Sequence, residues 1–250
     1  MVSKAKIKEI RALAYKKFRD ESGLFIAEGN KLVADMLPAF ACVWLIAHPR
    51  WIAVQGDIPA TELIPATDDD IRKISFLKTP QDVLAVFRKP QYTIEEANPA
   101  SQLILALDGL QDPGNLGTIV RAACWFGIEH IVCSTDTADV FSPKTVQAAM
   151  GALARVKVHY TNLEDYLKVN KSVPVYGAFL DGDSLFNKKL SRHGIIVMGN
   201  EGNGIRPEIE ALICERLYIP AYPPESKPTE SLNVAMATAI ICAAFRLLNL

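Results

Sequence analysis

The sequence predicts an α/β protein with a mostly parallel sheet that carries helices on both faces, preceded by a smaller α/β domain. Two observations support this fold class. After residue 101, strand-type apolar runs alternate with helical segments, which is typical of parallel sheets. Two of these runs, 103–107 and 194–197, lead into glycine loops, with which such sheets form pockets at the carboxyl ends of their strands. The 250 residues, half of them hydrophobic, suffice for one large domain or two smaller ones.

The first ninety residues are expected to form the smaller domain. The apolar spacing over 4–19 predicts one helix, which Gly23 ends. A strand, a helix and two further strands are expected at 25–27, 31–37, 42–47 and 83–87. The polar stretch 89–99, bracketed by prolines, is the best linker candidate. The predicted division is a domain, a linker and a second domain, over 1–90, 91–101 and 102–250.

After the linker, strands and helices are expected to alternate. Strands are predicted at 103–107, 129–133, 174–179, 194–198 and 216–219. Helices are predicted at 116–126, 143–151, 162–168, 207–213 and 232–248. Asn115 and Ser231 stand where N-caps belong, before the first and the last of these helices. The last helix is apolar nearly all round, which is typical of a helix buried in a core or in a subunit interface.

Charge is balanced overall but not along the chain. The formal net charge is -1, whereas the first twenty residues carry seven basic and two acidic side chains. A basic segment on a neutral protein suggests a local contact with a polyanion. The alternative is a solvated helix face.

Composition also limits the expected compartment. The first twenty residues are charged throughout, so no signal peptide is predicted, and the longest uncharged stretch, 231–245, is too short to span a membrane. The five cysteines form no C-x-x-C pair, and the four histidines lack metal-ligand spacing. We therefore expect a cytoplasmic protein with reduced cysteines, no membrane contact and no metal site.

Two charged residues beside the glycine loops are candidates for function. Arg121 lies among apolar residues of a predicted helix, so it either points outward into surface pairs or reaches over the preceding loop toward an anion. Glu201 is either a surface residue or a group that orients a catalytic side chain by a charge-assisted hydrogen bond. The glycine order over 199–204, G-x-x-G-x-G, fails the dinucleotide-binding fingerprint, and no P-loop G-K-[ST] is present.

Together these segments resemble one family. The motifs are N-x-G-x-x-x-R, G-x-E-G-x-G, I-P and S-L-N, at 115–121, 199–204, 219–220 and 231–233. In this order over 102–250, they resemble the SpoU or TrmH family of RNA ribose 2′-O-methyltransferases, within the SPOUT superfamily. Residues 25–31, F-I-A-E-G-x-K, resemble the family's ribosomal-protein-like RNA-binding domain. The chain departs from the family pattern at Gln147, where arginine is frequent, and in its long proline-rich loop between Pro220 and Ser231.

The resemblance implies methylation of a ribose 2′-hydroxyl in RNA, most readily rRNA, with S-adenosylmethionine as the cofactor. It implies a carboxy-terminal trefoil knot from about residue 195 and a homodimer joined through the last helix. The positions implied for catalysis are Arg121, Asn115, Glu201, Ser231 and Asn233. Those for the cofactor are Met198, Gly199, Gly204, Ile219 and Leu232. RNA contacts are expected from Lys4, Lys6, Lys8, Arg11 and Lys31.

Other functions remain open at this point. The substrate could be tRNA, or the chain could be an RNA-binding module of the same fold without catalysis, against which the presence of all five catalytic positions argues. A small-molecule nucleotide enzyme is a third class, against which the basic first segment and the failed fingerprint argue. Arg121 could act as a base or as a fixed cation. A guanidinium with a pKa above about 12 is hard to deprotonate, so we expect it to stabilise a phosphate or a developing oxyanion.

Overall fold

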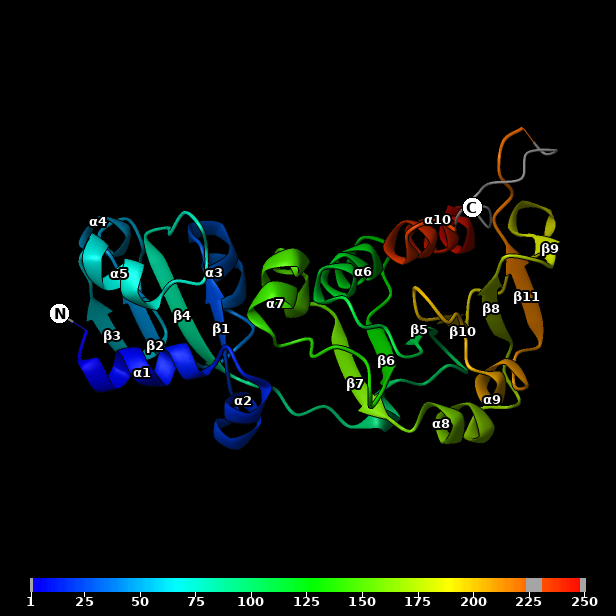
Figure 1. Ribbon diagram of the computed structural model, residues 1–250, viewed down its shortest axis with the longest axis horizontal. Coiled ribbons are helices and arrows are strands. Elements are labelled where there is room, and N and C mark those ends of the chain that lie inside the picture. The colour runs from blue at the N-terminus through cyan, green and yellow to red at the C-terminus, as the bar shows by residue number, and fades with distance from the viewer. Residues whose placement is uncertain (1, 224–230, 248–250) are drawn as a thin grey trace. The chain divides into compact units, whose positions relative to one another are not determined.

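The computed structural model describes residues 2–223 and 231–247 of the chain (Figure 1). The chain forms two units, each with its own sheet. The first comprises the chain up to Gln91 together with Asp139–Arg155, and the second comprises Tyr92–Ala138 and the chain from Val156 onward. The segment Asp139–Arg155, which falls within the predicted carboxy-terminal domain, therefore packs as part of the first unit. The division into functional domains stays a prediction.

The first unit is built on a four-stranded sheet in the order β1-β4-β2-β3. The strands are β1 Leu24–Glu28, β2 Cys42–Ala47, β3 Ala60–Pro65 and β4 Val83–Arg88. β4 is antiparallel to both β1 and β2, whereas β2 and β3 are parallel. The helices are α1 Lys4–Ala12, α2 Lys16–Ser22, α3 Asn30–Met36, α4 Pro49–Ile52, α5 Asp68–Ile74 and α7 Pro143–Ala149, with the 3-10 helix η2 Ala152–Ala154.

The two faces of this small sheet are buried by different parts of the chain. Ile26 of β1 packs in an apolar cluster with Ile10 of α1 and Ile74 of α5. Phe25, its neighbour, points to the opposite face, because successive strand side chains alternate. Its ring centroid lies 4.7 Å from that of Phe141, which precedes α7. The segment Asp139–Arg155 therefore completes the core of the first unit.

The single helix predicted over 4–19 is wrong: the structure has α1 and α2 with a break between them. Tyr15 is extended, with φ −98° and ψ 134°, and starts α2. The buried Arg19 guanidinium donates to the carbonyl oxygens of Leu13 and Ala14, at 2.7 and 2.8 Å. These carbonyls are thus satisfied by a side chain rather than by a continuing helix. Gly23, with φ +66°, ends α2 as predicted.

The second unit contains a seven-stranded sheet in the order β7-β6-β5-β10-β8-β11-β9, in which every strand pair is parallel. The strands are β5 Leu103–Leu107, β6 His130–Ser134, β7 Lys157–Thr161, β8 Val175–Phe179, β9 Asp183–Ser184, β10 Gly194–Met198 and β11 Glu215–Tyr218. The helices are α6 Pro113–Trp125, α8 Leu163–Val169, α9 Pro207–Glu210 and α10 Val234–Leu247, with 3-10 helices η1 Ile94–Glu96 and η3 Leu185–Asn187.

Helices cover both faces of this sheet. α6 and α10 pack against each other on one face, and α8 and α9 lie on the other (Figure 1). The predicted α/β fold with a mostly parallel, doubly covered sheet is therefore confirmed. The strand order places β10 between β5 and β8, and the trefoil knot stays a prediction. Within the described residues, no helix is both long enough and apolar enough to cross a membrane.

Candidate active site

The two glycine loops, which follow β5 and β10, start side by side at the carboxyl ends of these strands. β5 and β10 are parallel neighbours, with Leu107 opposite Met198. The pairing continues into the loops, since the Asp108 N–H donates to the Met198 carbonyl at 2.9 Å. The Asn200 side-chain Nδ2 then donates to the Gly109 carbonyl at 2.7 Å. The loops after the two strands are therefore fastened to each other.

The start of α6 differs from the prediction. Asp112, not Asn115, is the N-cap, and its Oδ1 accepts from the Asn115 backbone N–H at 2.8 Å. The cap position predicted for Asn115 is therefore wrong by one helical turn. Because Asp112 caps the helix, the Asn115 side chain is not needed as a cap. The Asn115 amide is instead used for contacts with the other two motifs.

Asn115 joins the three motif segments by hydrogen bonds. Its Nδ2 donates to Glu201 Oε1 at 3.0 Å, and its Oδ1 accepts from Asn233 Nδ2 at 3.1 Å. Asn233 Oδ1 accepts from the backbone N–H groups of Ala235 and Met236, at 2.9 and 3.3 Å. Asn233, rather than the predicted Ser231, therefore caps α10. The chain of donors runs in one direction and ends on the exposed Glu201 carboxylate.

The other two residues predicted for catalysis lie outside this hydrogen-bonded group. Arg121 is exposed on α6 and makes no hydrogen bond or ion pair with any residue that the structure describes. It shares one exposed face of the helix with Thr118 and Trp125. Ser231 is exposed and lies two residues before Asn233. The structure thus brings three of the five residues together, and the catalytic roles of all five stay predictions.

The second glycine loop is compact enough to require its glycines. Asn200 and Gly204 exchange two backbone hydrogen bonds, of 2.9 and 3.0 Å. A Cβ on Gly199 would lie 2.3 Å from the Gly204 carbonyl carbon, so only glycine fits there. Gly204 has φ +70°, which disfavours other residues. The turn presents backbone groups rather than side chains at the end of β10.

An ion pair between the buried Asp108 carboxylate and the partly exposed Arg206 guanidinium was not predicted from the sequence. Asp108 is 1% exposed and accepts from Arg206 at three atoms: the backbone N at 2.8 Å, Nε at 2.8 Å and Nη2 at 2.5 Å. The hydrogen bond to Asp108 raises the pKa of the Arg206 guanidinium. The position of Asp108 directly after a buried strand could have marked it as a candidate. Its partner Arg206 could not be predicted, because it lies 98 residues away in the sequence. The pair fastens the end of the second loop to β5.

The positions predicted for the cofactor come from two strand ends and the start of α10. Met198 is buried at the end of β10, followed by Gly199. Ile219 is half-buried after β11, which is separated from β10 by β8 alone. Leu232 is exposed beside the α10 cap. Tight glycine backbone beside apolar side chains fits an adenosine-containing ligand, and this set of contacts stays a prediction.

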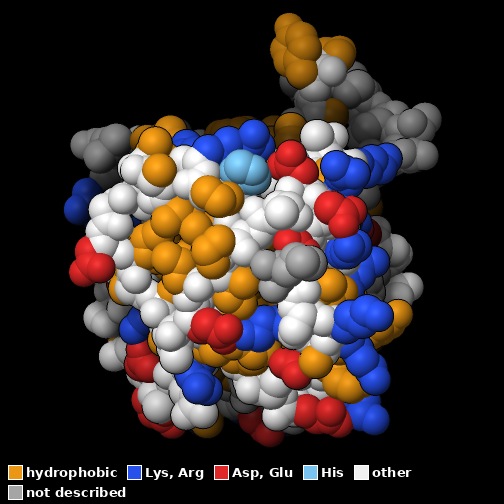
Figure 2. Space-filling view, turned by 90° about the vertical axis from the view of Figure 1, so that its left-hand side faces the viewer, with side chains coloured by type: hydrophobic (Ala, Val, Ile, Leu, Met, Phe, Trp, Pro, Cys, Tyr) orange, Lys and Arg blue, Asp and Glu red, His pale blue; other side chains and the backbone are white. Residues whose placement is uncertain are grey.

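The five residues predicted to contact RNA do not form one patch. Lys4 and Lys8 are exposed on α1. Lys6 forms an ion pair with Glu62, and Arg11 donates to the Ser75 carbonyl, so both are engaged within the unit. Lys31 is exposed on α3, across the small sheet from α1 (Figure 1). Figure 2 shows lysine and arginine side chains gathered along the right-hand edge of one side of the molecule.

Metal binding has no obvious place in the described structure. Among residues 2–223 and 231–247, no group of three or more histidine, cysteine, aspartate or glutamate side chains is arranged to hold an ion. The described cysteines are all free thiols. Cys133 and Cys242 are buried, and burial raises the pKa of both thiols. The groups that meet at the candidate site are amides, a carboxylate and loop backbone.

Comparison with known proteins gives this arrangement a family. The model of the SpoU rRNA methylase family matches residues 102–243, which contain all three motif segments. The chain belongs to the SpoU rRNA methylase family. The model of the MRM3-like substrate binding domain matches residues 4–85 of this SpoU-family chain.

Similar proteins cover nearly the whole SpoU-family chain. The 23S rRNA (guanosine(2553)-2′-O)-methyltransferase RlmP of Bacillus subtilis is 31% identical over 240 residues, which is 94% of each chain. A solved structure from Porphyromonas gingivalis, assigned to the TrmH family of RNA methyltransferases, is 44% identical with a TM-score of 0.87, covering 98% of each chain. An AdoMet-bound rRNA methyltransferase from Sinorhizobium meliloti is 31% identical with a TM-score of 0.85, covering 100% of this chain and 98% of that one.

Proposed function

We propose that the protein transfers a methyl group from S-adenosylmethionine to a ribose 2′-hydroxyl of ribosomal RNA. The observation that carries this proposal is the hydrogen-bonded group Asn115–Glu201–Asn233, in which the three SpoU motifs meet. The names of the Bacillus subtilis and Sinorhizobium meliloti relatives support the substrate class, and the second of these was solved with AdoMet. The presence of the complete motif set favours an enzyme over a catalytically silent RNA-binding module.

The pocket residues fit the cofactor class. We expect Met198, Gly199, Gly204, Ile219 and Leu232 to hold S-adenosylmethionine, largely through backbone groups of the second and third motifs. When bound, this cofactor supplies an electrophilic methyl group. Position 199 requires glycine, because any side chain there would collide with the Gly204 backbone. This requirement supports cofactor binding through backbone groups of the loop.

The chain's own residues would handle the hydroxyl proton and the developing charge. Glu201 ends the chain of donors with its carboxylate exposed, so it can accept a hydrogen bond from a ribose hydroxyl. Asn115, itself held by Asn233, would keep that carboxylate in a fixed orientation, which lowers the cost of reaching a near-attack geometry. Arg121 would stabilise the developing oxyanion as a fixed cation. The exposed Ser231 hydroxyl would orient the ribose.

We further propose a homodimer formed through α6 and α10. One face of α10 leaves Met236 and Leu247 60% and 58% exposed, and Trp125 at the end of α6 is 83% exposed. Arg246 of α10 donates to the Phe126 carbonyl, so the ends of the two helices are adjacent. Exposed apolar side chains gathered in this way are typical of an interface. Arg121 shares the α6 face with Trp125, so pairing would place it between two subunits.

The dimer can be tested by mass. Trp125→Glu should convert a dimer to a monomer in sedimentation equilibrium, because a charge would be buried in the interface. The matched control is Val169→Glu on α8, which is also 83% exposed but lies on the opposite face of the sheet. Equal masses for both variants and the unmodified protein would contradict the proposed interface.

The activity is tested with the full chain, labelled S-adenosylmethionine and RNA from a strain that lacks the protein. We expect label in rRNA and a phosphodiester linkage that has become resistant to alkali, since a 2′-O-methyl group blocks cleavage there. Label in tRNA alone would support the alternative substrate, and label on a base would contradict ribose methylation. The cytoplasm is the expected compartment because rRNA is the proposed substrate, and fractionation tests it.

A further inference from the structure

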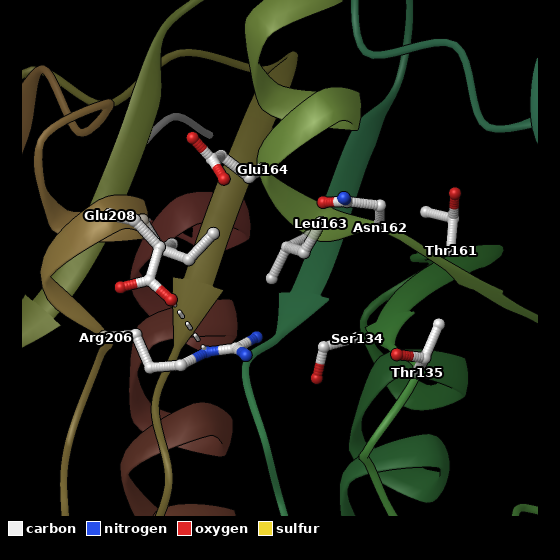
Figure 3. A pocket seen from close by; sticks show the side chains of 9 residues that line it. Ser134, Thr135, Thr161, Asn162, Leu163, Glu164, Arg206 and Glu208 are labelled. Atoms are coloured by element: carbon white, nitrogen blue, oxygen red, sulfur yellow. Dashed lines mark ion pairs between the residues drawn. The ribbon is translucent and has the colours of Figure 1, made fainter.

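A cavity lies beside the candidate site, at the carboxyl ends of β6 and β7. Its volume is about 440 Å³, within the range of about 300–1,000 Å³ typical of small-molecule pockets. Thr135 and Thr161 lie on one side and Arg206 and Glu208 on the other, with Leu163 between them (Figure 3). None of the residues Asn115, Glu201 and Asn233 lines this cavity. It is therefore a separate site with its own chemistry.

Arg206 forms a fixed wall of the cavity. Asp108 accepts three hydrogen bonds from Arg206, which hold both the backbone and the guanidinium of the arginine. Figure 3 shows the guanidinium reaching into the space between Glu208 and Ser134. A planar guanidinium with a fixed orientation is a surface on which RNA bases stack. The apolar side chains of Leu163 and Ile209 add further surface of the kind that packs against a flat ring.

The charges around the cavity select the kind of ligand. Asp108, Asp136 and Glu208 all lie within 4.0 Å of the Arg206 guanidinium, at 2.5, 3.8 and 3.9 Å. Glu164 adds another carboxylate at the rim, paired with Lys168. Carboxylates thus outnumber the cations, which disfavours a phosphate and favours a ligand that presents N–H donors. A nucleobase edge has such donors, whereas the sugar-phosphate backbone has none of this kind.

The cavity is also connected to the candidate site. Ser134, which lines it, accepts from the Gly109 N–H at 2.8 Å. The Gly109 carbonyl in turn accepts from Asn200, the neighbour of Glu201. Two hydrogen bonds therefore separate the cavity wall from the loop that carries Glu201. A base in the cavity would therefore contact residues that are hydrogen-bonded to the loop at which the ribose is expected.

We propose that this cavity binds an unstacked guanine base of the RNA substrate. Guanine presents two neighbouring N–H groups, N1–H and the N2 amino group, that can donate to one carboxylate, and its ring can stack on Arg206. Glu208 and Glu164 would both accept from this edge, the second through the other hydrogen of the N2 amino group, and the Thr135 and Thr161 hydroxyls would contact the remaining polar atoms. The inference rests on the proposed function for the presence of RNA.

The test uses the full chain and compares single carboxylate-to-amide changes. Glu208→Gln and Glu164→Gln should each raise KM for RNA about tenfold or more, because each removes a charged hydrogen-bond acceptor. The Kd for S-adenosylmethionine and the melting temperature should not change. Asp165→Asn is the control, since this neighbour of Glu164 lies in the first turn of the same helix but does not line the cavity. Lys168→Gln controls for the ion pair that Glu164 would lose.

Substitution in the RNA identifies the base and its place. Inosine lacks the N2 amino group, so replacing the relevant guanosine should raise KM for the unmodified protein but much less for Glu208→Gln or Glu164→Gln. Inosine at the methylated nucleotide and at its neighbours distinguishes the target base from a flanking one. Unchanged KM in both carboxylate variants, with normal methylation by the unmodified protein, would overturn the proposal while leaving the activity intact. No methylation by the unmodified protein would instead refute the proposed function.

A binding measurement does not depend on turnover. Free guanosine, added to the full chain in saturation-transfer NMR, should show contact, and adenosine, cytidine and uridine should show less. Glu208→Gln should weaken the guanosine signal. Equal signals from the four nucleosides, unaffected by Glu208→Gln, would contradict a guanine site whatever the activity of the protein.

Discussion

At the scale of single residues, Arg121 carries the largest expected effect on chemistry. Arg121→Ala should lower the single-turnover rate by about 100- to 1,000-fold, the usual loss for one preorganised charge-stabilising group. The fold and the affinity for S-adenosylmethionine should stay intact, because the side chain contacts no described residue. Arg121→Lys should keep a small residual rate, since lysine retains the charge without the planar fork.

The control for Arg121 is Thr118→Ala, one turn earlier on the same exposed face of α6. It should leave the single-turnover rate nearly unchanged. Near-normal turnover by Arg121→Ala, measured with saturating RNA and cofactor, would show that this arginine is a surface residue and that the charge-stabilising role is wrong.

His159 gives stability a dependence on pH. Its ring is 5% exposed, stacks on His130, and its Nδ1 has no partner among the described residues. Burial, and then the neighbouring His130, lower its pKa to about 4, with Glu96 and Lys157 as the other charges nearby. An unfolded chain titrates this residue near pH 6.5. The unfolded state therefore binds the proton more readily between these values, and stability falls as the pH drops through them.

We expect the free energy of unfolding to fall by on the order of 3 kcal/mol between about pH 6.5 and pH 4 because of His159. In His159→Phe this contribution should disappear, whereas above pH 7 the variant should be less stable, because the buried 3.0 Å hydrogen bond between His159 Nε2 and His130 Nδ1 is lost. Urea titrations across this pH range measure the effect. His193→Phe, at an exposed histidine, should keep the slope, and an unchanged slope in His159→Phe would refute the assignment.

At the scale of elements, α1 is the part of the first unit best suited to touch RNA. Its Lys4 and Lys8 are exposed on one side, whereas Lys6 and Arg11 hold other residues of the unit. The double change Lys4→Glu and Lys8→Glu should weaken RNA binding and reduce the slope of log Kd against log salt by about 1 to 2. Affinity for S-adenosylmethionine should not change.

The same charge change elsewhere is the control for α1. Lys171→Glu with Lys189→Glu alters two exposed lysines of the second unit. If both double variants weaken RNA binding equally, general electrostatics accounts for the loss and α1 is only a solvated face. Filter-binding titrations at several salt concentrations separate the two outcomes.

The elements differ in how far the sequence determines them. The run 103–107 is apolar throughout and became β5 with the same bounds, because a strand buried on both faces needs no other signal. β7 was missed, since the buried His159 and the flanking Lys157 and Thr161 hide its apolar pattern. The caps of α6 and α10 were each misplaced, because Asp112 and Asn233 were chosen by hydrogen bonds that only the folded chain reveals.

The candidate site was predictable as a set of motifs but not as a set of contacts. The spacing of the motifs identified Asn115, Glu201 and Asn233, which the fold brings into one hydrogen-bonded group. Asp108 and Arg206 were missed because neither belongs to a motif, and their pairing depends on the parallel placement of β5 and β10. Long-range partners of this kind follow from topology rather than from local pattern.

At the scale of the whole molecule, one buried ion pair joins distant parts of the chain. Arg19 of α2 donates Nε and Nη2 to Asp139 Oδ2, at 2.9 and 2.7 Å, with side chains only 3% and 9% exposed. Asp139→Asn would leave a buried guanidinium without its counter-charge. We expect the free energy of unfolding to fall by about 3 kcal/mol or more.

The matched control is Asp82→Asn, which breaks the exposed pair with Arg50. Exposed ion pairs contribute little, so its melting temperature should hardly change. Differential scanning calorimetry compares the two variants. A melting temperature for Asp139→Asn equal to that of Asp82→Asn would mean that the buried pair does not hold Asp139–Arg155 in the first unit.

The segment Asp139–Arg155 belongs to the first unit, although it lies between two parts of the second unit in the sequence. This arrangement has a consequence for proteolysis. The backbone passes between the units three times, after Gln91, Ala138 and Arg155. A protease that nicks the predicted linker severs one of these passages and leaves the other two. The two fragments should therefore co-elute under native conditions and separate only in denaturant, because Phe141 remains packed on Phe25. Fragments that part in native buffer would mean that the embedded segment is not what holds the nicked protein together.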